Sequence, residues 1–187
     1  MPDVIVVGGG PAGLSAALFT AKNGLDTAVF DTDNTWVHKA HLFNYLGIRS
    51  VDGSAFLKHA RGQVSDRGAT LNIGEAVEVV EPTDDGFTVG TDEADYDSRY
   101  VVLATGANRD LAADAGCSID EEGLVSVDLS METSVSDLYA TGAMVRQQEW
   151  QAIISAGDGA AAALNILSKE RGEHFHDFDT PEDVPEV

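Results

Sequence analysis

The sequence contains little cysteine, few basic residues and no long apolar run. One cysteine, Cys117, in 187 residues excludes a disulfide framework and a thiolate metal cluster. Eleven Lys and Arg residues stand against 32 Asp and Glu, which gives a formal net charge of −21. That balance excludes a general nucleic-acid binder, which needs clustered cations, and disfavours docking to an anionic membrane. Since no apolar run approaches membrane-spanning length and no basic leader precedes the first strand, we expect a cytoplasmic protein without a nucleic-acid or membrane partner.

The acidic residues are spread along the whole chain, and lysine occurs only at positions 22, 39, 58 and 169. Such a surface repels itself at low ionic strength and is relieved when salt screens it. We therefore predict a halophilic protein, adapted to a very salty cytoplasm. Two alternatives stay open: an ordinary acidic protein, and a protein that docks to a basic partner.

The first 31 residues have the pattern of a β-α-β unit. The β-branched run Val4–Val7 indicates a buried parallel strand, residues 14–23 form a helix rich in Ala and Leu, and residues 27–30 form a second strand ending at Asp31. Gly24 is placed to end the helix. With 43% hydrophobic residues the chain can bury one sizeable core, so we expect a single domain.

The rest of the chain continues the alternation of strands and helices. We predict an irregular aromatic segment at 32–50, a helix at 53–68, short strands at about 70–73 and 77–81, later strands of a small antiparallel meander at 86–89 and 96–99, a buried strand at 100–103, a loop at 107–123, strands at 124–127 and 138–140, a helix at about 151–170 and an acidic tail at 172–187. The predicted fold is α/β and Rossmann-like, with a central parallel sheet and a β-meander crossover.

The glycine-rich turn Gly8-x-Gly10-x-x-Gly13 carries the strongest functional signal. It follows a strand and opens a helix, and Asp31 ends the next strand 23 residues after Gly8. This spacing is typical of a dinucleotide site, in which backbone approaches a pyrophosphate at the helix N-terminus and the acid binds a ribose. An acid rather than a base at position 31 disfavours a 2′-phosphate. The alternative is a loop that merely packs tightly.

Three further stretches resemble the flavin domain of thioredoxin reductases and related flavoproteins with two dinucleotide-binding domains. They are Ala104-Thr105-Gly106, the stretch from Thr133 to Gly142, and the stretch from Gln151 to Gly159. The resemblance covers nearly all of residues 1–170. It implies an FAD-binding domain in which Thr133–Gly142 ends beside the flavin ribitol and Gln151 opens a helix whose N-terminus faces the flavin ring, where it would stabilise negative charge on the reduced flavin.

The resemblance also implies individual cofactor contacts. Gln151 and Ala152 would bind the pyrimidine edge of the flavin, and Asn44 matches a family asparagine that contacts it. The full set of expected cofactor-binding residues is Gly8, Gly10, Pro11, Ala12, Gly13, Asp31, Asn44, Val77, Thr105, Gly106, Gly142, Ala143, Gln151 and Ala152. No catalytic residue is assigned and no metal site is expected.

The sequence departs from the family pattern in four places. Only about residues 107–116 join the two halves of the domain, 1–106 and 117–171, at the point where the family inserts a nicotinamide-binding domain. The second G-x-G-x-x-G and the Cys-x-x-Cys of that domain are missing, so the chain is not a complete thioredoxin reductase. Ala143 stands where the family has an Asp that binds ribitol or phosphate, and Trp150 stands where some members have Arg.

Several reactive residue types are better explained without a function. Cys117 has no neighbouring partner for disulfide exchange. His38 and His41 could donate protons near the flavin, but packing or hydrogen bonding explains them more simply. His174 and His176 lie in an acidic tail without other metal ligands, so we expect them to be solvated.

Three functions stay open at this stage. The first is a minimal FAD-binding flavoprotein that passes electrons with a separate redox partner protein. The second is a non-catalytic protein that binds FAD, NAD or ADP-ribose and kept the fold without redox turnover. The third is a flavin subunit whose nicotinamide domain sits on another chain. A homodimer is compatible with each of them.

Overall fold

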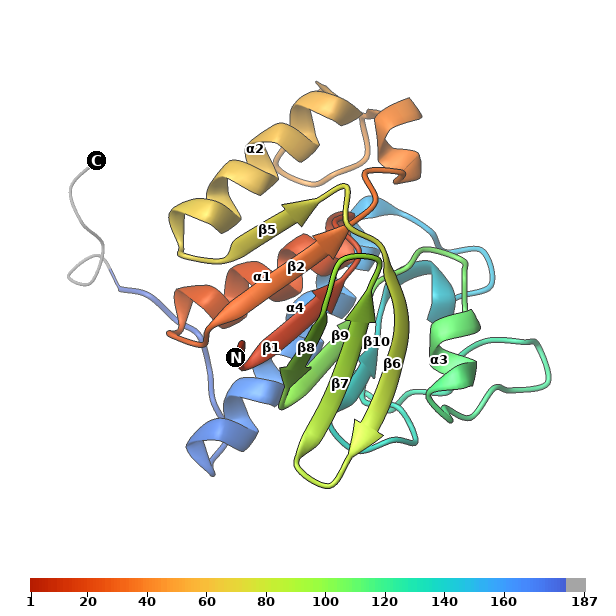
Figure 1. Ribbon diagram of the computed structural model, residues 1–187. Coiled ribbons are helices and arrows are strands. Elements are labelled where there is room, and N and C mark those ends of the chain that lie inside the picture. The colour runs from red at the N-terminus through yellow and green to blue at the C-terminus, as the bar shows by residue number, and fades with distance from the viewer. Residues whose placement is uncertain (181–187) are drawn as a thin grey trace.

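The computed structural model describes residues 1–180, and at its centre lies a five-stranded parallel sheet (Figure 1). Its strands, in spatial order, are β10 (Leu138–Ala140), β9 (Tyr100–Leu103), β1 (Val4–Val7), β2 (Thr27–Asp31) and β5 (Thr70–Ile73). Val4 of β1 pairs with Thr27 of β2 on one side and with Tyr100 of β9 on the other. The chain thus builds one half of the sheet outward from β1 and later returns to build the other half, as in doubly wound folds.

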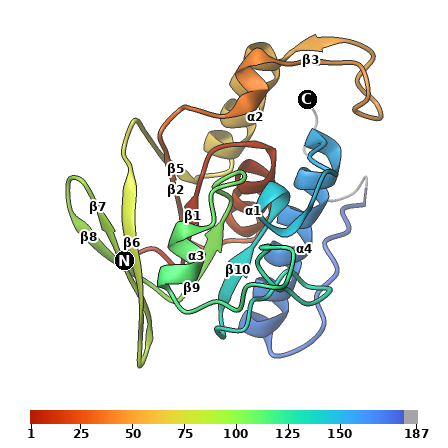
Figure 2. The same cartoon turned by 90° about the vertical axis from the view of Figure 1, so that its right-hand side faces the viewer.

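The two faces of this sheet are covered by different layers (Figure 2). Helices cover one face: α1 (Pro11–Lys22), α2 (Gly53–Asp66) and α4 (Ala152–Arg171). The other face is covered by an antiparallel meander of β6 (Val77–Thr83), β7 (Gly86–Thr91) and β8 (Asp95–Ser98), together with the short helix α3 (Asp110–Asp114). Because both faces are covered, β1, β2, β9 and β10 are buried along their whole length.

Local sequence explains where the helices begin and end. Pro11 occupies the first turn of α1, where its missing N–H is not needed, and Gly24 follows the helix with a φ of +90°. Asp52 caps α2 through its carboxylate, which accepts a hydrogen bond from the Ser54 backbone N–H at 2.9 Å. Gly172 ends α4 in the left-handed conformation.

Most predicted elements are confirmed to within a few residues, and four segments differ. Residues 70–73 form the edge strand of the parallel sheet beside β2, so the meander begins only at β6. The segment 107–123, predicted as a loop, contains α3. Residues 124–127 form only isolated bridges with 119 and 133 rather than a strand. The segment 32–50 contains a 3-10 helix, η1 (Trp36–Lys39), and the strand β3 (His41–Leu42), which pairs with β4 (Val51–Asp52).

The predicted tail from 172 onward is described only as far as residue 180, and 181–187 lie outside the described residues. Residues 173–180 form neither helix nor strand, but Asp177 and Asp179 accept hydrogen bonds from Lys22 of α1 at 2.7 and 2.6 Å. Among residues 1–180, no helix has the length and apolar content that crossing a bilayer requires.

Candidate functional site

A cavity of about 640 Å³ opens where β1, β2, β9 and β10 end. The loops that follow these strands line it, including those at Gly8, Thr32, Ala104 and Thr141. The chain reverses its direction across the sheet between β1 and β9, and ligands of open α/β sheets bind at this kind of switch point. The volume lies within the range of about 300–1,000 Å³ usual for small-molecule sites.

Packing explains two of the three motif glycines in the turn after β1. Gly8 has a φ of +112°, and a Cβ at this position would lie 2.3 Å from the carbonyl oxygen of Ala104. A Cβ at Gly13 would lie 1.9 Å from the carbonyl oxygen of Gly8. Neither position can hold a larger residue, whether or not a ligand is bound.

Gly10 is different, because only one side chain and no backbone atom lies near it. The nearest atom to a Cβ built there is the hydroxyl oxygen of Thr35 at 3.3 Å, and the backbone has an ordinary extended conformation. Gly10 also lines the cavity. A glycine that packing does not require, at the wall of a cavity and the start of a helix, fits close approach of a ligand to the backbone.

Two helices direct N-termini without a side-chain cap toward this cavity. Neither α1 nor α4 has a side-chain cap or an acidic residue in its first turn, although the chain has 32 acidic residues. Ala12 of α1 and Ala152 of α4 both line the cavity. By contrast α2, which starts away from it, is capped by Asp52. The positive ends of α1 and α4 are therefore available to an anionic ligand.

Asp31 lies at the cavity wall with its side chain 6% exposed. One carboxylate oxygen, Oδ2, accepts a hydrogen bond from Arg61 at 2.8 Å. The same guanidinium donates to Asp33 at 2.6 Å, and His38 lies 2.8 Å from the same Asp33 oxygen. Arg61 and then His38 lower the pKa of the Asp33 carboxyl. Among the described side chains only Arg61 bonds to Asp31, so Oδ1 remains available to accept from a ligand hydroxyl.

The rim of the cavity brings together residues that lie more than a hundred positions apart in sequence. The Asn44 side-chain amide donates to Oε1 of Gln151 at 2.8 Å. Beside them the rings of Trp36 and Trp150 lie 5.3 Å apart, and both line the cavity. The indole N–H of Trp150 donates to the carbonyl of Arg146 at 2.9 Å, so the loop that carries it has a defined conformation.

Two arginines hold the loop after β10, which carries Ala143 at the position of the family's Asp. Ala143 lines the cavity and is buried. Arg109 donates to the carbonyl oxygens of Met144 at 3.0 Å and of Ala143 at 3.4 Å, which ties the short junction between the two halves to this loop. Arg146 pairs with the buried carboxylate of Asp158 on α4, and this contact raises the pKa of the Arg146 guanidinium.

The structure gathers the residues predicted from sequence around one site. Those lining the cavity are Gly8, Gly10, Pro11, Ala12, Asp31, Val77, Thr105, Gly106, Gly142, Ala143 and Ala152. Gly13 packs under the turn, and Asn44 and Gln151 meet at the rim. Sequence reasoning missed Arg61, Trp36 and Arg109. Only Trp36 had a local signal, since it lies in the aromatic segment; Arg61 and Arg109 are placed by tertiary contacts.

Cys117 is separate from this site. It is buried, its thiol lies 3.4 Å from the Thr133 hydroxyl, and burial raises its pKa. A thiol that resists ionisation is a poor nucleophile. The interpretation of Cys117 as a non-reactive residue agrees with this environment.

The chain resembles known flavoproteins along most of its length. The family model described as pyridine nucleotide-disulphide oxidoreductase matches residues 45–160, more than half of the chain, and a model described as FAD binding domain matches residues 3–38. A thioredoxin reductase of Listeria monocytogenes is 31% identical over 170 residues, 89% of this chain and 50% of that protein. A ferredoxin–NADP reductase of Lactococcus lactis is 30% identical over 136 residues, 66% of this chain and 42% of that protein.

These comparisons identify the fold, the family and the cofactor. The thioredoxin reductase of T. acidophilum superposes with a TM-score of 0.85 at 19% identity, covering 91% of this chain and 99% of that one. The chain spans about half the length of the curated relatives it matches. The turn at Gly10 and the two uncapped helix N-termini fit a dinucleotide, and the model described as FAD binding domain matches the segment that carries this turn. The chain thus belongs to the pyridine nucleotide-disulphide oxidoreductase family and has the FAD-binding domain of its thioredoxin and ferredoxin–NADP reductase-like members.

Proposed function

We propose that this protein is a minimal FAD-dependent electron-transfer domain that works with a separate redox partner. The observation that carries the proposal is the junction between its two halves, 1–106 and 117–171. Where the family inserts a nicotinamide-binding domain, this chain has only a short link that contains the five-residue helix α3. We further propose that residues 1–171 are one domain and that 172–187 are an acidic tail.

Several groups at the cavity would hold the cofactor. The backbone of the Gly8–Gly13 turn and the N-terminus of α1 would bind the pyrophosphate, and the free Oδ1 of Asp31 would accept a ribose hydroxyl. Asn44, Gln151 and Ala152 would hold the pyrimidine edge of the flavin. FAD supplies reversible two-electron chemistry when bound, and the positive end of α4 would stabilise the negative charge that reduction brings.

Two observations keep a non-catalytic nucleotide-binding function as the second candidate. Ala143 offers no carboxylate to the ribitol, and Asn44 already donates to Gln151 rather than into the cavity. A weak flavin half-site would leave the ADP half as the main source of affinity, so NAD or ADP-ribose could bind there instead. A third arrangement, with the nicotinamide domain on a separate chain, is one form of the partner-dependent function.

The released ligand distinguishes the first two candidates. We expect protein purified at high salt to be yellow, and the ligand released on denaturation to have the mass of FAD. Replacing Gln151 by Ala should shift the flavin absorption bands and weaken retention, whereas Gln147→Ala, an exposed glutamine four residues earlier, should do neither. A colourless protein that releases NAD or ADP-ribose would establish the non-catalytic function.

Intrinsic fluorescence should report occupancy of the cavity directly. The protein contains two tryptophans, Trp36 and Trp150, and both line the cavity. Titrating FAD into apo-protein should therefore quench most of the tryptophan emission, since the flavin absorbs in the range where tryptophan emits. Adenosine diphosphate, which lacks the flavin, should bind with little quenching. Tight binding of FAD with unchanged emission would place the flavin away from these two rings.

The net charge predicts how the stability of the fold depends on salt. Measuring that dependence tests our proposal that the protein works in a salty cytoplasm. With a net charge of −21, self-repulsion should destabilise the fold in dilute buffer, so the thermal midpoint should rise toward molar KCl. Screening saturates early, because the Debye length is already about 3 Å at 1 M. A further rise above about 1 M would indicate ion binding or salting-out of the core. A midpoint that does not rise contradicts the halophilic interpretation.

A further inference from the structure

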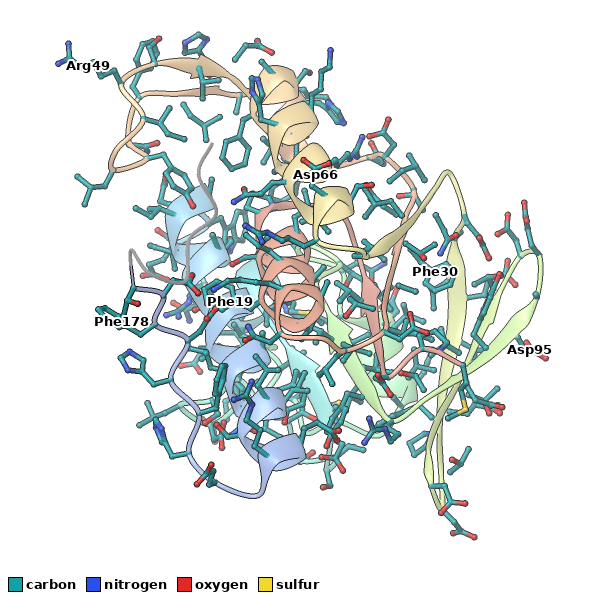
Figure 3. The ribbon with its side chains drawn as sticks, turned by 90° about the vertical axis from the view of Figure 1, so that its left-hand side faces the viewer. Phe19, Phe30, Arg49, Asp66, Asp95 and Phe178 are labelled. Carbon is teal, nitrogen blue, oxygen red and sulfur yellow. The ribbon has the colours of Figure 1, made fainter. Side chains whose placement is uncertain are left out.

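One exposed segment of this acidic protein carries no acidic residue. Residues 34–51, which we call the acid-free lobe, lie between Asp33 and Asp52 and contain neither Asp nor Glu. Lys39 and Arg49 give the lobe a formal charge of +2 in a chain whose net charge is −21. Both side chains are exposed, and among the described residues neither has an ion-pair partner. Figure 3 shows Arg49 pointing away from the body of the molecule.

The carboxylates nearest in sequence bond to groups other than Lys39 and Arg49. Asp33 accepts hydrogen bonds from Arg61 and His38, and Asp52 caps α2. The one acidic residue of the neighbouring segment 142–151 is Glu149, which is exposed. The lobe is therefore a local positive region on a negative surface.

The lobe also exposes large apolar side chains. Phe43 is 72% exposed and Leu46 is 88% exposed. Trp36, near the start of the lobe, is 57% exposed. Exposed apolar groups ringed by charge are typical of protein-binding surfaces. In Figure 2 the segment that carries β3 extends past α2 at the top of the molecule.

Contacts at its base give the lobe a defined position at the mouth of the cavity. Asn44 bonds to Gln151, the rings of Tyr45 and Phe56 lie 5.5 Å apart, and the His41 ring nitrogen lies 2.9 Å from the Ser50 hydroxyl. The rings of Trp36 and Trp150 make a tilted contact at the cavity wall, with their centroids 5.3 Å apart. A protein bound to the lobe would thus lie next to the start of α4, where the flavin is expected.

We propose that the acid-free lobe is the docking surface for a small acidic redox protein, with Lys39 and Arg49 as its charged contacts and Phe43 and Leu46 as its apolar ones. This inference rests on the proposed function, which requires a redox partner. At low ionic strength an acidic partner would be repelled by most of the surface and attracted to the lobe, so charge would select the orientation that brings it to the cavity. At molar salt, where charge is screened, the apolar contacts Phe43 and Leu46 would carry the binding.

Two other occupants fit the structure less well. An anionic membrane is wide enough to meet the acidic body as well as the lobe, so the net charge opposes it. A second copy bound permanently through the lobe would cover the cavity mouth that the redox partner needs.

The test measures binding of an acidic [2Fe–2S] ferredoxin to the protein. Cytochrome c, a basic electron carrier of similar size, serves as the control for the partner's charge. We compare the wild type with Lys39→Glu/Arg49→Glu and with Lys58→Glu/Arg67→Glu, which makes the same change of charge at two exposed residues, one in α2 and one at its C-terminal cap. Surface plasmon resonance with and without FAD should show ferredoxin binding that the lobe variant weakens at least tenfold and the control variant at most twofold to threefold. Raising the salt from about 0.1 M to about 1 M, where the Debye length falls from about 10 Å to about 3 Å, should also weaken it.

Equal weakening by both variants, or a preference for cytochrome c, would overturn the proposal. Two further results would also overturn it. One is that the wild type binds phosphatidylglycerol vesicles and only the lobe variant loses that binding; the other is that light scattering shows a wild-type dimer that only the lobe variant fails to form. The flavin content of each protein separates this inference from the proposed function. Two molecules of pre-reduced ferredoxin supply the two electrons that full reduction of one FAD takes. Should reduced ferredoxin reduce the bound FAD equally fast in the lobe variant, the docking surface is wrong and the function stands; should the wild type retain no FAD, the proposed function fails whatever the binding result.

Discussion

Replacing Gly10 by valine is expected to strip the protein of FAD while leaving the fold intact. The backbone at Gly10 has φ −82° and ψ −174°, which valine adopts readily, and a Cβ there meets only Thr35 at 3.3 Å. The added methyl groups would instead occupy the space where the pyrophosphate must approach the turn. We expect at least a hundredfold loss of affinity, which is about 2.7 kcal/mol.

The ratio of flavin to protein absorbance after gel filtration measures this effect, and circular dichroism checks the fold. Two control variants give the result its meaning. Gly62→Val on α2, where a Cβ meets nothing within 4 Å, should retain FAD. Gly8→Val should fail to fold, because its Cβ would collide with the Ala104 carbonyl at 2.3 Å. If Gly10→Val holds the same nucleotide with unchanged affinity, the pyrophosphate does not lie at this turn.

NADH and NADPH are expected to reduce the bound FAD of the purified protein at a rate below about 1 s⁻¹, which lies under the usual range of enzyme turnover. Hydride transfer requires reacting atoms held about 3–3.5 Å apart. The link that replaces the family's nicotinamide domain supplies only α3 and its flanking residues. Four carboxylates, those of Glu75, Glu78, Asp110 and Asp114, also line the cavity and would repel the phosphates of a second dinucleotide.

Stopped-flow mixing of the FAD-loaded protein with each nicotinamide would measure this rate from the flavin absorbance. Dithionite serves as the positive control, because it needs no binding site and should bleach the flavin band completely. High salt should be included, since screening removes the electrostatic part of the barrier but not the positioning part. Bleaching by NADH or NADPH at ordinary turnover rates would establish a nicotinamide site within these 187 residues and end the partner-dependent proposal.

Sequence patterns predicted best the elements whose environment is local or uniform. The strands at 4–7, 27–31 and 100–103 are short, mostly apolar runs buried on both faces, and α4 is a helix of twenty residues, long enough to show a period. The strand at residues 70–73 was predicted correctly. Which sheet so short a strand joins, however, depends on partners elsewhere in the chain. The five residues of α3 are too few to show a helical period.

In the candidate site, too, the parts with a local sequence signal were predicted and the parts that depend on tertiary contacts were not. The Gly-rich turn and Asp31 follow from spacing, because the β-α-β unit places them without help from the rest of the chain. The resemblance suggested that Asn44 and Gln151 face the same group, and they lie in contact at the rim. The Arg61–Asp31 pair and the tilted ring contact between Trp36 and Trp150 join segments that no local pattern connects. They could be found only from the folded structure.

The close contact between α1 and α4 has a consequence for how the binding site comes into being. A Cβ on Gly159 of α4 would lie 2.0 Å from the carbonyl oxygen of Ala12, so the two helices touch backbone to backbone although these residues are 147 positions apart. During synthesis the turn at Gly8–Gly13 emerges first, yet its cavity lacks a wall until α4 has left the ribosome. Contacts of this range form slowly, because a long loop must close before they stabilise anything. FAD added to refolding protein should therefore act after the rate-limiting step, slowing unfolding without speeding folding.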